Sequence, residues 1–338
     1  MRSMIVVLVI ALSTAYADNA PLELTVELNK TEIHVFDPAY FIFTIRNKTD
    51  RDVAVCAEVI TQLRGRGLWS LYSPGERTLV VVFRAYIAEN FFIIPAQKYL
   101  KFVVYAYNAG ELTDHYKGYN EGSEEQWSLY AILRHKLTPG ARKRYKEFAS
   151  KHNATIWEGE IRSNDFPFKF VPPTTPDDQV VFEHYKKEHL RPSDNVTFAI
   201  EDTCNEELKR KLPNHPIWDY WFWYVNEILL RPSWSIWVGK QSDEEPLRRR
   251  MERFLARVDE LIDRRRSEPE FRGIIEDLLW GKIAVLYALG RDAEAEALKQ
   301  SIIAKEPNRC FFFELQWLKK VVPGLKRAVQ RELQTEKQ

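Results

Sequence analysis

The sequence predicts a chain of two parts: a β-sandwich that carries a helical insertion, followed by an all-α region built from helical hairpins. Apolar residues alternate with polar ones in short runs before residue 171, which indicates half-buried strands. Beyond it they recur every three or four residues, as on amphipathic helices. A Pro-rich run at 171–178, typical of a linker, separates the two patterns. We therefore expect the sandwich at residues 18–173 and the helical part at residues 174–338.

The first strand shows the alternation most clearly. Leu22, Leu24, Val26 and Leu28 alternate with polar residues. Short runs of the same kind, separated by turn residues, are typical of an antiparallel sandwich. Further strands are expected at 41–45, 53–59, 79–83, 99–105, 155–161 and 166–171.

Two helices are expected to interrupt the sandwich as an insertion at about 111–152. One is predicted at 124–136 and the other at 141–151. Thr138 precedes Pro139 and Gly140, so it is placed to cap the second helix. Surface loops tolerate such insertions.

Two parts of the sandwich sequence resemble the immunoglobulin-like domains of exported bacterial proteins. The first is the run from Leu22 to Val55, and the second is Trp157-x-Gly159-x-Ile161-x-Ser163-Asn164. The helical insertion departs from that family. The resemblance implies adhesion, spacing or scaffolding rather than chemistry, although fold alone does not decide function. The matching positions of the first run are Lys30, Ile33, Asp37-Pro38 and Asn47-Lys48-Thr49.

The helical part begins its clearest pattern at Leu247. Apolar residues spaced by three and four predict one long amphipathic helix that must pack on others. Leu255 and Ile262 widen the apolar stripe. The stripe consists of Leu247, Met251, Phe254, Val258 and Leu261.

The next unit, with helices at 274–289 and 292–305, resembles a tetratricopeptide-type hairpin. Gly290, Ala295 and Pro307 match the turn, the small position of the second helix and the terminating proline. The first helix departs from the repeat, because Leu279, Lys282 and Ile283 stand where Trp, Leu and Gly are expected. Such arrays present concave surfaces to partners. Residues 211–216 resemble a turn between repeats that leads into a helix at 217–230, and the tail after Pro323-Gly324 is expected to form a capping helix.

The first 17 residues read as a secretory signal peptide. Arg2 supplies the positive charge, Met4 to Leu12 the apolar segment, and Ala15-Tyr16-Ala17 the cleavage site. A retained anchor is the alternative. Removing Arg2 turns 49 basic and 48 acidic residues into 48 and 48, which gives no general attraction to nucleic acid or anionic lipid. No later run is long and apolar enough to span a bilayer, so we expect a secreted or periplasmic protein.

The most unusual feature is an aromatic cluster in the helix expected at 217–230. As a surface it would bind sugars or a protein partner, whereas a helix that is apolar on nearly every side is more typical of a core. Asp219 and Glu227 lie about 12 Å apart along the helix, too far for paired catalysis, so they are expected to bond indole groups or face solvent. The candidate binding residues are Trp218, Trp221, Trp223 and Tyr224.

Other chemistry has weaker support. Three cysteines allow a Cys204–Cys310 disulfide, and three buried thiols with Cys56 are the alternative. His184 and Glu188 share a helical face without enough ligands for zinc, so no metal and no cofactor are expected. The basic runs 248–250 and 264–266 are expected to be solvated, or else to bind an acidic partner. No nucleophile motif is present.

The sequence therefore favours an exported, non-catalytic scaffold or binding module at the cell envelope, with a protein or an envelope polysaccharide as partner. One alternative is a protease inhibitor that presents a loop at 65–75 or 111–122. Another is a hydrolase whose site assembles between the two parts.

Overall fold

The structure, a computed structural model, describes residues 20–34, 40–56, 70–72, 78–85, 91–105, 125–188, 208–219, 222 and 246–335. Several predictions lie outside these ranges: the signal peptide at 1–17, Cys204, and both proposed inhibitor loops apart from residues 70–72. The same holds for three members of the aromatic cluster, Trp221, Trp223 and Tyr224.

The strands lie where the alternating pattern predicts most of them. The first strand shows the expected pattern, since every second residue is buried in the core. The strands are β1 (Leu22–Leu28), β2 (Glu32–His34), β3 (Tyr40–Asn47), β4 (Val53–Cys56), β5 (Ser70–Tyr72), β6 (Thr78–Ala85), β7 (Phe91–Ile94), β8 (Tyr99–Tyr105), β9 (Glu125–His135), β10 (Thr155–Ile156), β11 (Gly159–Arg162) and β12 (Phe166–Val171).

The described strands form mixed sheets, which corrects the expected purely antiparallel pairing. The largest sheet has the order β2-β12-β9-β6-β5, with β11 also paired to β9. In this sheet β6 runs parallel to β9, and β2 runs parallel to β12. Two smaller sheets have the orders β1-β3-β8 and β10-β4-β7. The sequence could not reveal this pairing, because alternation shows which face of a strand is buried and not the direction of its neighbour.

Strand β9 replaces the helix predicted at 124–136, so that prediction was wrong. Trp127, Leu129, Ala131 and Leu133 are buried, while the residues between them are partly exposed. This is a period of two, as a strand requires. Leu, Ala, Glu and Gln, which favour helices, obscured the alternation. The expected insertion therefore contains one described helix, α4 (Pro139–Lys151), capped by Thr138 as predicted.

The remaining helices follow the linker. The helix α5 begins at Pro176, inside the predicted linker, because Thr175 and Asp178 form a reciprocal cap in which each backbone amide donates to the other side chain. Within the described residues, no helix combines the length and the apolar composition needed to cross a bilayer. The helices are α5 (Pro176–Glu188), α8 (Leu247–Arg265), α9 (Arg272–Ala288), α10 (Asp292–Lys305) and α11 (Phe312–Thr335).

The long helix and the hairpin predicted from the sequence are confirmed by α8, α9 and α10. All five residues that form the core face of α8 belong to the predicted stripe. The helix α9 is the central member, since it contacts α8, α10 and α11. The last helix differs from its prediction, because α11 begins at Phe312 and continues through Pro323, whereas the sequence placed a separate helix after Pro323.

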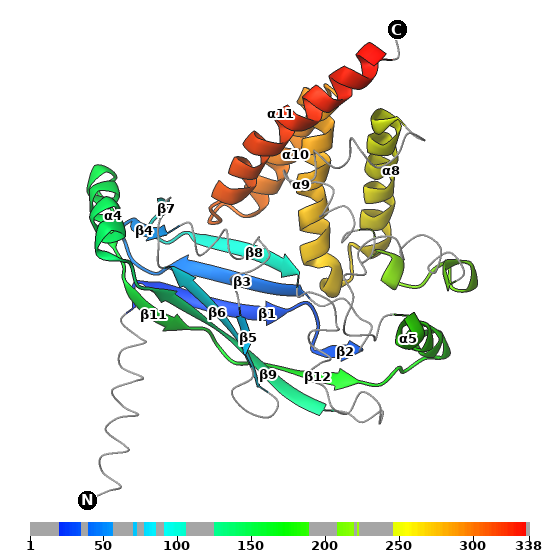
Figure 1. The fold of residues 1–338 in the computed structure, drawn as a ribbon, viewed down its shortest axis with the longest axis horizontal. Coiled ribbons are helices and arrows are strands. Elements are labelled where there is room, and N and C mark those ends of the chain that lie inside the picture. Colours follow the sequence, from blue (N-terminus) through cyan, green and yellow to red (C-terminus); the bar gives the residue numbers. More distant parts are fainter. Residues whose placement is uncertain are drawn as a thin grey trace, which may run out of the picture.

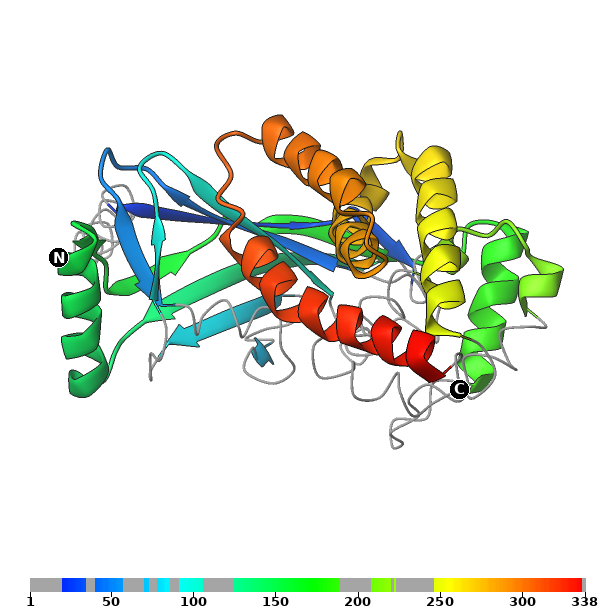
Figure 2. The same ribbon diagram turned by 90° about the horizontal axis from the view of Figure 1, so that it is seen from above.

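The molecule is built in three layers (Figure 1). The large sheet packs against one face of the β1-β3-β8 sheet, and α8 to α11 stand on the other face. Seen from above, α4 lies at one end of the sheets, away from α8 to α11 (Figure 2). The strand β3 serves both interfaces: Phe41 and Phe43 belong to the core between the sheets, while Tyr40 belongs to the helical core.

Tyr40 connects the sheet to the start of α9. Its ring is fully buried, its hydroxyl donates to the carbonyl oxygen of Glu270 at 2.5 Å, and it accepts the amide of Gly273 at 3.1 Å. Burial raises the pKa of Tyr40, so the hydroxyl keeps its proton. A Cβ at Gly273 would lie 2.6 Å from the Tyr40 ring, closer than real contacts allow. A glycine at this position lets the helix approach the strand.

Replacing Gly273 with alanine is expected to lower the free energy of unfolding by about 1 to 3 kcal/mol, because the added methyl group overpacks a buried ring. Urea unfolding of the two proteins measures the difference. Gly140→Ala is the matched control, since nothing lies within 4 Å of a Cβ built there. Equal effects of the two substitutions would show that the close contact with Tyr40 does not limit stability.

Candidate functional site

Of the four candidate aromatic residues, the structure describes one, Trp218. Its side chain is buried, with 8% exposed, and belongs to the core of the sheet region. Its indole N–H donates to the carbonyl oxygen of Leu212 at 2.6 Å. Trp218 is thus a core residue of the segment 208–219 and presents no open ring face to a sugar. Trp221, Trp223 and Tyr224 lie outside the described residues, so their role as a binding surface stays a prediction.

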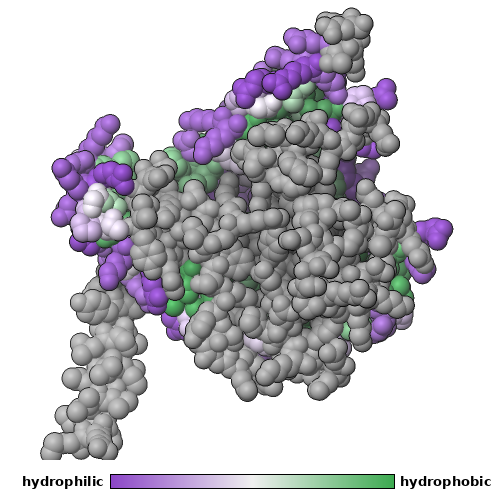
Figure 3. All heavy atoms as spheres, viewed as in Figure 1, coloured by the Kyte–Doolittle hydropathy of each residue, from purple (hydrophilic) through white to green (hydrophobic). Residues whose placement is uncertain are grey.

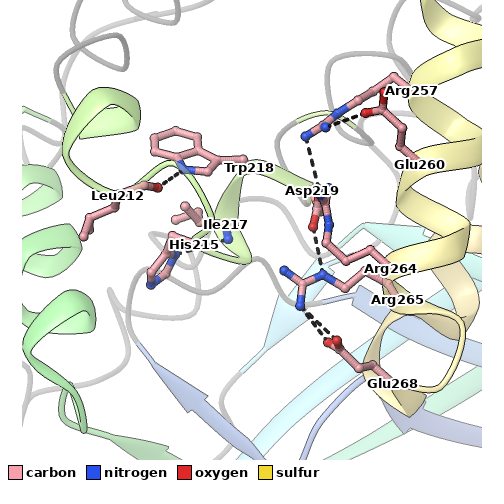
Figure 4. A network of polar contacts seen from close by, with 10 residues as sticks. All are labelled: Leu212, His215, Ile217, Trp218, Asp219, Arg257, Glu260, Arg264, Arg265 and Glu268. Atoms are coloured by element: carbon pink, nitrogen blue, oxygen red, sulfur yellow. Dashed lines mark hydrogen bonds and ion pairs between the residues drawn. The ribbon is translucent and has the colours of Figure 1, made fainter.

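Beside Trp218, His215 (Figure 4) holds the segment to α5 through a contact with Asp178 of that helix. His215 Nε2 lies 3.2 Å from Asp178 Oδ1, and His215 Nδ1 accepts the amide of Ile217 at 3.3 Å. Burial alone would raise the pKa of Asp178, but hydrogen bonds from Thr175 and His215 lower it. Because Nδ1 is an acceptor, the proton is on Nε2 and faces the carboxylate. Neither nitrogen is left to take a proton from a substrate.

On its other side the segment is held to α8 by Asp219 (Figure 4). The Asp219 carboxylate is 2% exposed, and three arginines reach it. Arg264 and Arg265 approach to 2.5 and 2.8 Å, and Arg257 to 3.4 Å. Burial alone lowers the pKa of Arg265, and its hydrogen bonds to Asp219 and Glu268 outweigh that effect and raise it. The expectation that Asp219 bonds indole groups or faces solvent was therefore wrong.

These contacts also change the interpretation of the second basic run. Arg264 and Arg265 pair with Asp219, Arg265 also pairs with Glu268, and Arg266 pairs with Asp263. Arg257 adds a bond to Glu260. Four arginines thus meet four carboxylates, and the end of α8 is electrically balanced. Opposite charges that neutralise one another leave no excess positive field for an acidic partner.

A second set of ion pairs joins the helices to the sheet, centred on Arg309. Its side chain is 3% exposed and contacts three glutamates: Glu306 at 3.0 Å, Glu314 at 2.9 Å, and Glu276. Lys101 of β8 pairs with Glu276 at 2.7 Å. Burial alone lowers the pKa of Arg309, but the neighbouring carboxylates raise it, so the guanidinium remains charged. We call this cluster the Arg309 joint.

The backbone strengthens the same joint. The amide of Tyr99 donates to the carbonyl oxygen of Asn308 at 3.0 Å, and the amide of Cys310 donates to that of Tyr99 at 2.7 Å. Arg309 therefore pairs with Tyr99 of β8 through a single parallel β-bridge. Next to it, the rings of Phe92, Phe102 and Phe313 pack with centroids 5.1 to 5.5 Å apart. Of these residues, sequence reasoning singled out Cys310 alone, as a candidate disulfide partner of Cys204.

The third buried polar cluster surrounds His135 at the end of β9. The ring is 1% exposed, stacks on Trp157 at 5.4 Å, and meets Tyr145 of α4 edge-on at 5.2 Å. Nδ1 lies 2.6 Å from the carbonyl oxygen of Trp157, so it must donate, and Nε2 has no hydrogen-bond partner among the described residues. Burial lowers the pKa of His135, against the opposing effect of the Trp157 bond. The neutral ring is the stable form here.

His135 predicts acid sensitivity. Because its pKa is lower in the folded chain than in the unfolded one, the unfolded chain binds a proton first as the pH falls. The free energy of unfolding should therefore be highest above about pH 6.5, the ordinary value for histidine, and should decline below it. Urea midpoints measured from pH 8 to pH 5 test this.

The His135→Asn variant keeps an N–H donor for Trp157 and should show a flatter pH profile than the natural chain. His152→Asn is the control, because His152 is exposed and lies at the end of α4, the helix that carries Tyr145. If His135→Asn and the natural chain have parallel profiles, His135 does not carry the acid sensitivity.

Cysteines and metal ligands add no reactive centre within the described residues. Cys56 is buried and Cys310 is a half-buried free thiol. Burial raises the pKa of Cys310, which disfavours the reactive thiolate. Cys204 lies outside the described ranges, so the Cys204–Cys310 disulfide gains no support. Among the described residues, no three His, Cys, Asp or Glu side chains are placed to hold one metal ion. The side chains of His184 and Glu188 are not described.

The polar side chains that the structure brings together are thus committed to one another. His215 and Asp219 fasten the segment 208–219 to two helices, and Arg309 fastens the helices to the sheet. This arrangement resists movement between the described parts of the chain, and the buried Nε of Arg309 is a donor that has no hydrogen-bond partner among the described residues. Compared with known protein families, with curated proteins and with solved structures, the chain matches none.

Proposed function

We propose that this chain is an exported, non-catalytic binding module or scaffold that acts at the cell envelope. The observation that carries the proposal is the Arg309 joint. Its charged groups are buried between sheet and helices and bond to one another. A buried ion pair fixes orientation more than it adds stability. A body whose parts are held at a fixed angle suits a protein that presents surfaces to partners.

The finer fold belongs to the same proposal: an immunoglobulin-like sandwich and a tetratricopeptide-like helical part. The α9–α10 hairpin supports the second assignment. Gly290 has a φ of 77° in the turn, a conformation that favours glycine, and Ala295 is fully buried against its neighbours. The mixed sheets and the long α11 depart from both families, so the relationship is one of architecture.

The two alternatives have less support. A hydrolase between the parts would need a base with a nitrogen or oxygen open to substrate, and His215 and Asp178 bind each other instead. A protease inhibitor would need a protruding rigid loop, and the loops expected at 65–75 and 111–122 lie outside the described residues apart from 70–72. The binding module therefore remains the function that the contacts favour.

Affinity capture with the chain from residue 18 onward tests the proposal. The immobilised protein is incubated with an envelope extract, and each captured protein or polysaccharide is purified and titrated back against the chain. A component that rebinds stoichiometrically supports the proposal. A protease that rebinds and loses activity favours the inhibitor instead. Hydrolysis of a captured component by the purified chain, or no rebinding component at all, would overturn it.

A further inference from the structure

The helix α4 and its flanks carry an excess of positive charge. Residues 136–152 contain six basic residues and one acidic residue, Glu147, a formal net charge of +5. The whole chain has a net charge of +1, so all other residues together sum to −4. The excess of positive charge on this segment therefore exceeds the net charge of the whole chain. The basic residues are Lys136, Arg142, Lys143, Arg144, Lys146 and Lys151.

Unlike the arginines at the end of α8, the lysines of α4 are not neutralised. Lys143, Lys146 and Lys151 are exposed and form no ion pair among the described residues. Arg142 is the exception, since it forms a bidentate pair with Glu158 at 2.8 Å. This pair ties the helix to the turn before β11. The side chains of these three lysines are exposed to water, where they are available to a polyanion.

The apolar face of α4 is already used. Ala141, Tyr145 and Ala149 are buried against the sheet region. The Tyr145 hydroxyl donates to the carbonyl oxygen of Ala54 and accepts the amide of Trp157 at 3.0 Å. The helix therefore cannot lay an apolar face into a lipid bilayer, as interfacial helices do. Any partner of its outer face must be recognised by charge.

The exposed charges are also spread around the helix. At about 100° per residue, Lys146 and Lys151 lie about 140° apart around the axis, with Lys143 between them. Figure 3 shows hydrophilic side chains gathered over α4 at the end of the molecule remote from α8 to α11. The positive surface is therefore a projecting convex ridge, charged on top and on both flanks.

We infer that α4 is a docking ridge for an anionic polysaccharide. A flexible chain of carboxylate or sulfate groups can bend over the ridge and reach both flanks, whereas a flat bilayer meets only its top. This inference rests on the proposed function and names the chemistry of its partner. The contacts are long-range and exposed to water, so binding weakens as salt is added.

Binding of dextran sulfate to the chain from residue 18 onward, measured by titration calorimetry at low salt, tests the inference, with neutral dextran as the blank. The Lys143→Glu, Lys146→Glu, Lys151→Glu triple variant should bind dextran sulfate at least about tenfold more weakly. Each lysine close to an anionic surface increases the affinity several-fold, and the triple variant removes three of them. A matched triple on α11, Lys319→Glu, Lys320→Glu and Arg327→Glu, makes the same charge change on exposed residues elsewhere and should retain binding.

Urea unfolding of both triples checks that they fold. The inference would be overturned if the natural chain did not bind dextran sulfate. It would also be overturned if both triple variants lost the same affinity, because binding would then depend on net charge alone. Binding only to phosphatidylglycerol vesicles would overturn it in favour of a membrane surface. The proposed function is tested separately. If the α4 triple variant still captures a protein from the extract that rebinds to it, the proposal of a binding module is supported even if α4 does not bind a polysaccharide.

Discussion

Replacing Arg309 with methionine is expected to lower the free energy of unfolding by about 3 to 5 kcal/mol. The guanidinium is buried among Glu276, Glu306 and Glu314, and its loss leaves Lys101 as the cation that pairs with Glu276 and Glu306. Carboxylates that stay buried without a partner cost more than the ion pair contributed. Since small domains have only about 5 to 15 kcal/mol in all, the effect should be plain in urea unfolding.

Two further variants make this test specific. Arg291→Met removes an exposed arginine that pairs with Glu294, and should cost under about 1 kcal/mol. Adding Glu314→Gln to Arg309→Met should recover part of the loss, because it removes one buried negative charge. If Arg309→Met is no more harmful than Arg291→Met, the joint does not hold the helices to the sheet.

Replacing Asp219 with asparagine is expected to lower the free energy of unfolding by about 3 kcal/mol. The substitution keeps the shape of the side chain and removes the charge that Arg257, Arg264 and Arg265 share. Arg265 is 11% exposed and cannot turn fully to water, while Arg264 is 42% exposed and can. Most of the lost free energy of unfolding therefore comes from Arg265, which stays largely buried. Its remaining pair with Glu268 limits the loss.

Asp263→Asn provides the control for this experiment. Asp263 also binds an arginine, Arg266, but both side chains are more than two-thirds exposed. Surface pairs of this kind contribute under about 1 kcal/mol. Urea unfolding of the two variants side by side therefore separates burial from pairing. Equal midpoints would contradict the view that Asp219 anchors the segment 208–219 to α8.

The helices α8, α9 and α10 were predictable because each of them has a regular pattern of its own. Leu247 to Leu261 form an uninterrupted stripe, and that stripe is the buried face of α8. β9 was not predicted, although Trp127 to Leu133 alternate, because its residues favour helix locally and pairing on both sides overrides that preference. Strand direction depends on distant partners, which a single strand does not specify.

The polar clusters could not be assembled from the sequence. Lys101, Glu276 and Arg309 are far apart in the chain, and no spacing relates them. A weaker signal was present: Arg309 directly precedes the apolar run at 310–313, and Asp219 stands among Trp and Tyr residues. A charge inside an apolar stretch needs a partner when it is buried. That rule predicts that a partner exists but cannot identify it.

Tyr40 and Phe41 are neighbours along β3, yet one side chain faces the helices and the other faces the large sheet. A shift of β3 therefore changes the packing of both hydrophobic cores at once. The two cores cannot unfold independently, because loss of packing in either one removes contacts from β3, which the other core also needs. The described parts of the molecule should accordingly unfold together, as one cooperative unit, even though apolar residues alternate in the first part of the sequence and recur every three or four residues in the second.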